Sequence, residues 1–303
     1  MFDRCLPTAL GATALALSAC TATTQVTPAV VRPAADQMAW AAACDDWDGW
    51  DKPGPAFRIH GNTYYVGTCG ISAILVADPA GHILIDSGTD PGAKVVLANI
   101  RALGFDPADV RYLLHSHEHF DHVGGHARIA AATSAQVIAS EAAAIVLGSG
   151  TVAHNDPQAA IHPPMQPVSV NGIVLDGQTV ASGDAVLTAI ETPGHSPGAL
   201  SWQWDSCDDG EDCVSLVFAD SLFPISADGY SFLDNPAYLS AFEQGLGRVA
   251  TLRCDILLTP HPSASKMPVR LAGTAPLRNA EACRQYAADI GAKLEERLDK
   301  EAG

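Results

Sequence analysis

Four of the histidines in this chain fall within eight consecutive residues, in the stretch HSHEHFDH at positions 115–122. The stretch follows a short apolar segment, residues 110–114, whose composition predicts a β-strand. It precedes two glycines at 124–125, where we expect a helix to start. Side chains that can bind metal therefore gather at the end of a strand. We expect the fold to bring further metal-binding side chains to the same edge of the sheet.

The spacing inside the cluster predicts two metal positions. Side chains two residues apart in an extended segment point to the same side, so His117 and His119 can hold one ion. Asp121 and His122 follow where the chain turns towards the helix, and they can reach a second point nearby. Imidazole suits zinc, and zinc also accepts a carboxylate. We expect His115 to end the strand rather than to bind metal.

Two other kinds of segment could carry such a cluster. A solvated histidine-rich loop is one alternative. A metal-binding helix of the His-Glu-x-x-His type is the other, and it fails because position 121 is Asp rather than His.

Two more histidines lie in loops bounded by proline and glycine. His195 sits in TPGHSPG at 192–198, and His261 sits in LLTPHP at 257–262. Each loop follows a predicted strand, and loops on a rigid scaffold commonly carry ligands. Either histidine alone could equally be a surface residue. Together with the cluster, we expect both to bind metal.

The rest of the chain predicts an α/β fold in two halves. Strands are expected at 57–60, 64–67, 71–77, 82–86 and 110–114, then at 137–140, 168–180, 185–192, 199–204, 214–219 and 255–259. Helices are expected at 91–104, 238–253 and 277–298. This order predicts two sheets packed together with helices outside. We expect Trp40, Trp47 and Trp50 to belong to the first packed segment.

The N-terminus has the features of an export signal. Residues 1–20 combine an arginine at position 4, an apolar run at 6–19 and small residues at the end. The apolar run is too short for a permanent membrane helix. The sequence LSAC ending at Cys20 resembles a lipoprotein cleavage box, so Cys20 could be lipidated; plain cleavage nearby is the alternative. We expect a tether at 21–37 and one folded domain at 38–303.

Charge and cysteine usage narrow the function. The chain has 34 acidic and 17 basic residues, a formal net charge of -17, and such a surface repels a nucleic-acid backbone. Six cysteines follow the signal, and an even number in an exported chain suggests disulfides. Cys207 and Cys213 flank an acidic loop, so we expect a local bridge there. Zinc ligation by cysteine is not supported, because the sequence contains no Cys-x-x-Cys spacing.

The cluster matches the His-x-His-x-Asp-His signature of the metallo-β-lactamase superfamily. More narrowly, the chain resembles class B, subclass 3 β-lactamases of the three-disulfide AIM type. The resemblance rests on residues 57–67, 83–88, 115–122, 192–198, 218–222, 228–230 and 259–263. It implies an αβ/βα sandwich of two mixed sheets with the site at one edge between them. It also implies the disulfides Cys44–Cys69, Cys207–Cys213 and Cys254–Cys283.

The resemblance implies two Zn²⁺ ions as cofactors. The first would be held by His117, His119 and His195, and the second by Asp121, His122 and His261. Three protein ligands per ion leave positions open for water and substrate, as a catalytic site requires. A zinc-bound hydroxide, oriented by Asp121, would attack the amide bond of penicillins, cephalosporins and carbapenems without a covalent acyl-enzyme. Such an enzyme would confer antibiotic resistance.

Three further residues are expected to bind substrate. The resemblance implies that Ser221 helps to hold the substrate carboxylate, although a buried structural serine is an equal alternative. Gln158 lies in a loop that borders the site in relatives. Phe223 stands where the family commonly has Ser or Thr, and a phenyl ring cannot donate to a carboxylate, so the substrate spectrum is expected to differ.

The same fold carries other functions. A lactonase or a glyoxalase II-like thioesterase is the main alternative, since those enzymes bridge their metals with an Asp near position 220, and Asp220 is present. A metal-binding lipoprotein without activity is another. The export signal and the setting of His261 favour a β-lactamase. We expect a periplasmic monomer with a small-molecule substrate, no nucleic-acid partner, and membrane attachment only through a lipidated Cys20.

Overall fold

The computed structural model describes residues 33–208 and 211–303. The expected signal peptide, its Cys20 and most of the expected tether lie outside the described residues. Helix α1 (Ala35–Ala43) begins within the range expected for the tether, so positions 35–37 are helical. Among the residues that the structure describes, no helix is both long enough and apolar enough to cross a membrane.

The first sheet of the described chain has seven strands in sequence order. They are β1 (Phe57–His60), β2 (Thr63–Tyr65), β3 (Ile74–Val76), β4 (His82–Ile85), β5 (Val110–Leu114), β6 (Gln136–Ala139) and β7 (Gly172–Ile173). Strands β1 to β4 pair antiparallel, whereas β4 to β7 pair parallel. The sheet is therefore mixed.

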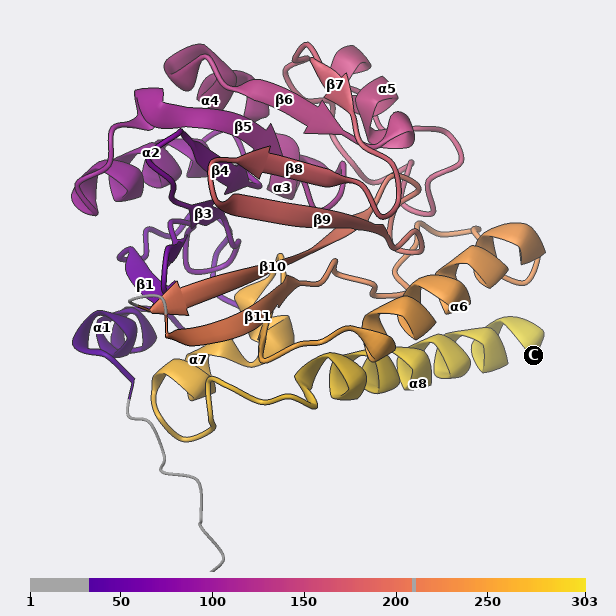
Figure 1. The fold of residues 1–303 in the computed structure, drawn as a ribbon. Coiled ribbons are helices and arrows are strands. Elements are labelled where there is room, and N and C mark those ends of the chain that lie inside the picture. Colours follow the sequence, from indigo (N-terminus) through magenta and orange to yellow (C-terminus); the bar gives the residue numbers. More distant parts are fainter. Residues whose placement is uncertain (1–32, 209–210) are drawn as a thin grey trace, which may run out of the picture. The chain divides into compact units, whose positions relative to one another are not determined.

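The second sheet has five strands in the described residues, in the order β12-β11-β10-β9-β8. They are β8 (Thr179–Ser182), β9 (Ala185–Glu191), β10 (Leu200–Asp208), β11 (Asp212–Phe218) and β12 (Ile256–Leu258). Only the β11–β12 pair is parallel. Figure 1 shows β8 to β11 stacked against the first sheet.

Helices cover the outer face of each sheet. Side chains of α2 (Gly92–Ala102), α4 (His126–Thr133) and α5 (Glu141–Ser149) pack on the first sheet. Those of α6 (Pro236–Thr251) and α8 (Ala282–Ala302) pack on the second, and these two helices run side by side in Figure 1. Shorter elements are α3 (Phe120–Val123), α7 (Met267–Leu271) and the 3-10 turns Pro107–Asp109 and Pro262–Ser265.

Strand alternation divides the apolar side chains between the layers. In β4, Ile83 and Ile85 join the core between the sheets, whereas Leu84 packs against the helices outside. In β11, Leu216 faces the central core and Val217 faces α6 and α8. Both faces of these strands are buried, which explains their unbroken apolar runs. The αβ/βα sandwich expected from the sequence is confirmed.

One predicted strand is wrong in extent. Residues 168–180 do not form a single strand; they contain β7 and the first two residues of β8, which belong to different sheets. Gly177, with a φ of 74°, lies in the turn between them. A left-handed backbone at that position interrupts any extended run.

All three disulfides implied by the resemblance are present: Cys44–Cys69, Cys207–Cys213 and Cys254–Cys283. The second joins β10 to β11 at the end of their hairpin. The third joins the chain before β12 to the start of α8. Structural disulfides of this number are typical of proteins in an oxidising compartment.

Candidate metal centre

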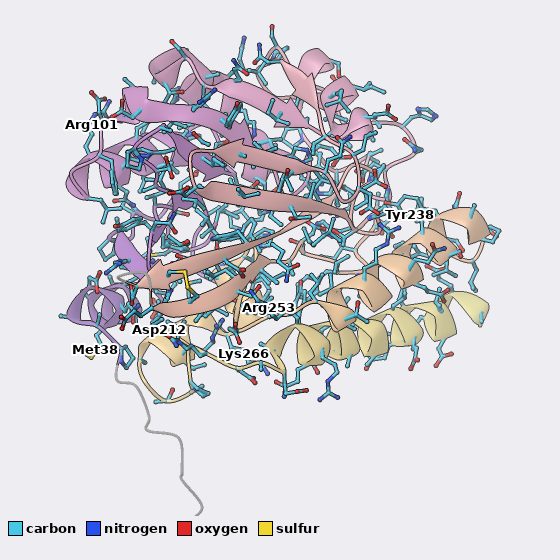
Figure 2. All side chains as sticks on the ribbon, in the orientation of Figure 1. Met38, Arg101, Asp212, Tyr238, Arg253 and Lys266 are labelled. Atoms are coloured by element: carbon cyan, nitrogen blue, oxygen red, sulfur yellow. A yellow bond between two sulfur atoms is a disulfide. The ribbon has the colours of Figure 1, made fainter. Side chains whose placement is uncertain are left out.

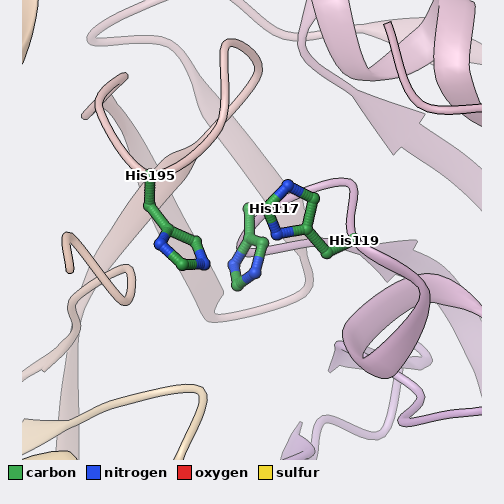
Figure 3. A group of neighbouring side chains, drawn as sticks. All are labelled: His117, His119 and His195. Carbon is green, nitrogen blue, oxygen red and sulfur yellow. The ribbon is translucent and has the colours of Figure 1, made fainter. Parts of the chain in front are cut away.

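Three imidazoles from the two halves of the sandwich meet at one point. His117 and His119 follow β5, and His195 lies in the loop between β9 and β10. One ligand atom from each lies within 4.8 Å of the others. Figure 3 shows His195 reaching towards His117 and His119 from the opposite side.

A second trio adjoins the first. Ligand atoms of His117, Asp121 and His122 also lie within 4.8 Å of one another. Asp121 and His122 stand on α3, the single helical turn that follows the extended segment. Asp121 Oδ2 lies 3.0 Å from His122 Nε2 and 3.5 Å from His261 Nε2. The structure thus brings together all six residues expected as ligands.

Backbone contacts between the halves hold this arrangement. The Leu200 N–H donates to the Ser116 carbonyl (2.6 Å), and Trp202 Nε1 donates to the His115 carbonyl (2.8 Å). His115 Nε2 accepts from the Ser140 N–H, so this ring serves the scaffold, as expected. The start of β10 is thereby fixed against the histidine cluster.

Each of the five clustered imidazoles has one ring nitrogen facing an acceptor. The contacts are His117 Nδ1 to Asp220 Oδ1 (2.7 Å), His119 Nε2 to Asp156 Oδ2 (3.0 Å), His122 Nδ1 to Asp86 Oδ2 (3.6 Å), His195 Nδ1 to the Phe223 carbonyl (2.9 Å) and His261 Nδ1 to the Gly70 carbonyl (3.3 Å). Such acceptors hold the outer nitrogen of each ring and orient the imidazole, as in known metal sites. The donor set therefore fits a metal centre.

One buried atom supports this fit directly. His117 is fully buried, and its Nε2 has no hydrogen-bond partner among the described residues. An unpaired polar atom in such a place is costly unless a ligand satisfies it. His117 belongs to both trios, so its free nitrogen faces the common point.

Burial also keeps two of the rings neutral. It lowers the pKa of His119 and of His195 to about 3, and only the neutral imidazole binds metal. Around His122, burial opposes protonation, but the carboxylates of Asp121 and Asp86 outweigh it and raise the pKa to about 10. Burial likewise opposes the charge on Asp121, yet the neighbouring imidazoles of His122 and His261 hold its pKa well below the usual value.

Of the three residues expected to contact substrate, Gln158 and Phe223 contact His195, and Ser221 follows Asp220 in the chain. Gln158 Nε2 is 3.3 Å from His195 Nε2. Ser221 is buried, and its Oγ has no hydrogen-bond partner in the described part of the chain. Phe223 holds His195 through its carbonyl, and its ring contacts Trp47 edge-on, with centroids 6.1 Å apart.

Several neighbours of the centre were missed or misplaced by sequence reasoning. Trp47 and Trp50 were expected in the packed segment, but they are 59% and 42% exposed and lie beside His261. Of these three tryptophans, Trp40 alone is in the core. His162 stacks on His119 with ring centroids 3.9 Å apart. It lies within the long loop between α5 and β7, ten residues before that strand, so no local pattern indicated it.

Two other features lie outside the centre. A groove of about 1580 Å³ reaches the aromatic residues Trp50 and Phe120, but neither trio lines it. His60, Asp208 and Asp212 form a third group near the hairpin end of β10, where Figure 2 labels Asp212. Arg278 contacts both His60 and Asp212, which makes this group an ion-pair network rather than a cation site.

Comparison with known proteins agrees with this architecture. The metallo-beta-lactamase superfamily model matches residues 66–208. The structure of the MIM-2 metallo-β-lactamase is 54% identical, covers 89% of this chain and 100% of its own, and superposes with a TM-score of 0.85. MEM-A1, a subclass B3 metallo-β-lactamase from a soil metagenome library, is 41% identical over 84% of this chain and 99% of its own, with a TM-score of 0.80.

Curated relatives match over a shorter length. The N-acyl homoserine lactonase AttM of Agrobacterium fabrum is 33% identical over 42% of this chain and 57% of its own length. The chain thus spans little more than half of this relative, whereas it spans the whole of MIM-2. By that full-length similarity the chain belongs to the metallo-β-lactamase superfamily, in which the subclass B3 enzymes are its structural neighbours.

Proposed function

We propose that this protein is a zinc-dependent β-lactamase, which hydrolyses the amide bond of penicillins, cephalosporins and carbapenems and so confers resistance. The observation that carries the proposal is the pair of adjoining His/Asp trios, built from both halves of the sandwich. The 54% identity to MIM-2 over its full length supports the same substrate class.

We assign His117, His119 and His195 to the first ion and Asp121, His122 and His261 to the second. The unpaired Nε2 of His117 and the outer partners of the other rings support this assignment. Zinc bound there supplies Lewis acidity and an activated water at neutral pH. The chain's own contribution is to hold these ligands in fixed orientations at a buried edge of the sandwich.

Asp121 is the residue we assign to the reaction itself. Its depressed pKa keeps the carboxylate ionised, so it can accept a hydrogen bond from the attacking water and orient it. The imidazole nitrogens of His122 and His261 lie 3.0 and 3.5 Å from this carboxylate. No serine or cysteine nucleophile is needed.

Substrate recognition falls to the residues around the trios. The unpaired hydroxyl of Ser221 can donate to the substrate carboxylate, and the amide of Gln158 can contact the β-lactam beside the first ion. The Phe223 side chain offers only apolar contact. The carboxylate therefore has one hydroxyl donor where a Ser or Thr at position 223 would supply two.

The alternative is a lactonase or thioesterase. In those enzymes an Asp near position 220 bridges the metals, but here Asp220 Oδ1 contacts the outer nitrogen of His117, and Asp220 belongs to neither trio. This contact favours the β-lactamase.

We also propose that the enzyme is exported to the periplasm and acts there as a monomer. The three disulfides support an oxidising compartment. Attachment through a lipidated Cys20 remains a proposal from the sequence. The net charge of -17 makes nucleic acid an improbable partner.

A hydrolysis panel tests the function. We expect turnover of a penicillin, a cephalosporin and a carbapenem that is lost with a chelator and restored by zinc, with little turnover of a thioester or lactone. His119→Ala should nearly abolish turnover in a folded protein, whereas His154→Ala, which removes an exposed imidazole, should not. Hydrolysis that survives complete zinc removal contradicts the mechanism.

A further inference from the structure

Glu118 lies between two candidate ligands, His117 and His119, yet its side chain belongs to neither trio. It is fully buried, and none of the ion pairs found among residues 33–208 and 211–303 includes it. A buried carboxylate without a cation is expensive unless strong hydrogen-bond donors surround it. Its position therefore needs an explanation that the proposed reaction does not supply.

Both carboxylate oxygens are occupied by the loop that carries His195. Ser196 Oγ donates to Glu118 Oε2 (2.6 Å), and the Gly198 N–H donates to Glu118 Oε1 (2.7 Å). These two contacts satisfy both oxygens of the buried carboxyl group. The Glu118 side chain, which belongs to the first half, thus binds the loop of the second half at Ser196 and at Gly198.

Glycine at position 198 allows the loop to approach Glu118 this closely. A Cβ at Gly198 would lie 2.6 Å from the Ala143 nitrogen and 2.8 Å from Glu118 Oε2, so only glycine fits. Ser140 Oγ also donates to the Gly198 carbonyl (2.7 Å). The residues after His195 are therefore held on both sides, by Glu118 and by the start of α5.

We propose that Glu118 is a positioning residue, which clamps the His195 loop to the His117–His119 segment and thereby sets the affinity of the first metal site. The proposal rests on the proposed metal-dependent function. Without the clamp, the third ligand of that site is free to move away from the two ligands on the other half.

Substitutions at Glu118 separate the clamp from mere packing. Glu118→Ala removes both acceptors. Glu118→Gln keeps both contacts, because its oxygen can accept from the Gly198 N–H while its amide donates to the Ser196 hydroxyl. Ser196→Ala removes one of the two contacts and leaves Glu118 in place. Asn99→Ala is a matched control, since it removes a buried side chain that donates to three carbonyls outside the metal centre.

The measurement is zinc affinity by chelator competition in the full chain, without substrate. A His261→Ala background, which lacks one proposed ligand of the second ion, makes tight binding report the first site. Loss of an outer partner typically costs about 10–100-fold in metal affinity, and we expect such a loss for Glu118→Ala. A smaller loss is expected for Ser196→Ala, near-parental affinity for Glu118→Gln, and no change for Asn99→Ala.

Parental affinity in Glu118→Ala, or an equal loss in Asn99→Ala, overturns the clamp. If Glu118→Ala does not fold, Ser196→Ala decides, and unchanged affinity there overturns the proposal. Because no substrate is present, a wild-type protein that binds zinc but hydrolyses no β-lactam refutes the proposed function alone.

Discussion

At the scale of single residues, the carboxylate of Asp220 separates the two candidate activities. It accepts from His117 Nδ1 at 2.7 Å, while the backbone carbonyl of Asp220 accepts from the Tyr286 hydroxyl at 2.9 Å. As an outer partner, Asp220 orients His117 and raises its basicity. We predict that Asp220→Ala lowers zinc affinity by about 10–100-fold and lowers activity at limiting zinc.

Excess zinc provides the control for this variant. An outer partner affects occupancy, so added zinc should restore most of the turnover. A metal-bridging aspartate belongs to the reacting centre, and its loss could not be compensated in this way. Activity that stays low at saturating zinc would therefore favour the lactonase or thioesterase alternative.

Substitution of Phe223 is expected to change the affinity for substrate. The ring contacts Trp47, while the backbone carbonyl, which any residue provides, holds His195. We predict that Phe223→Ser lowers KM for a penicillin by about tenfold, since a hydrogen bond to a charged group contributes roughly 1.5 kcal/mol or more. The check is steady-state kinetics, with kcat expected to change little.

Phe223→Leu is the matched variant, because it removes the ring without adding a donor. If the Ser and Leu variants shift KM alike, contact between the substrate and the ring decides affinity, and the missing donor does not.

At the scale of elements, the disulfides tie segments of very different length. Cys207–Cys213 closes a separation of 6 residues and Cys254–Cys283 one of 29. Loop-closure entropy predicts a loss of about 2.2 kcal/mol for the first and about 3.6 kcal/mol for the second. Replacing each pair by alanine and measuring the free energy of unfolding in denaturant tests the order. Zinc content should not change, because neither bridge contacts a candidate ligand.

Elements were predicted well from the sequence where apolar residues recur with a simple period on one face or on both faces, as in β1, β5, β11 and α2. It missed α5, although Ser140 caps its start and Gly150 ends it with a φ of 72°. Alanines and other apolar residues occupy most of that helix, so no amphipathic period marks it. The run at 168–180 was misjudged because its Gly177 turn was read as part of a strand.

At the scale of the whole molecule, the six proposed ligands could be named from the sequence, but their surroundings could not. The cluster and the two Pro/Gly loops are visible locally, and the family signature joins them. The partners of His117 and His119 are Asp220 and Asp156, which lie 103 and 37 residues away in sequence. Only the folded sandwich pairs residues so distant, so the clamp at Glu118 and the stacking of His162 were invisible in the sequence.

Because both halves supply ligands, bound zinc should stabilise the whole sandwich. A ligand that binds only the folded state adds about 4 kcal/mol when its free concentration is about 1,000 times Kd, which for a domain of this size corresponds to a rise in Tm of roughly 10 °C. We therefore predict a fall of that order when a chelator removes zinc from the wild type, measured by thermal unfolding. In a His195→Ala/His261→Ala double variant, which lacks both proposed ligands from the second half, chelation should lower Tm much less. An equal fall in both proteins would mean that zinc stabilises one half by itself, and that the two halves are joined by their common core alone.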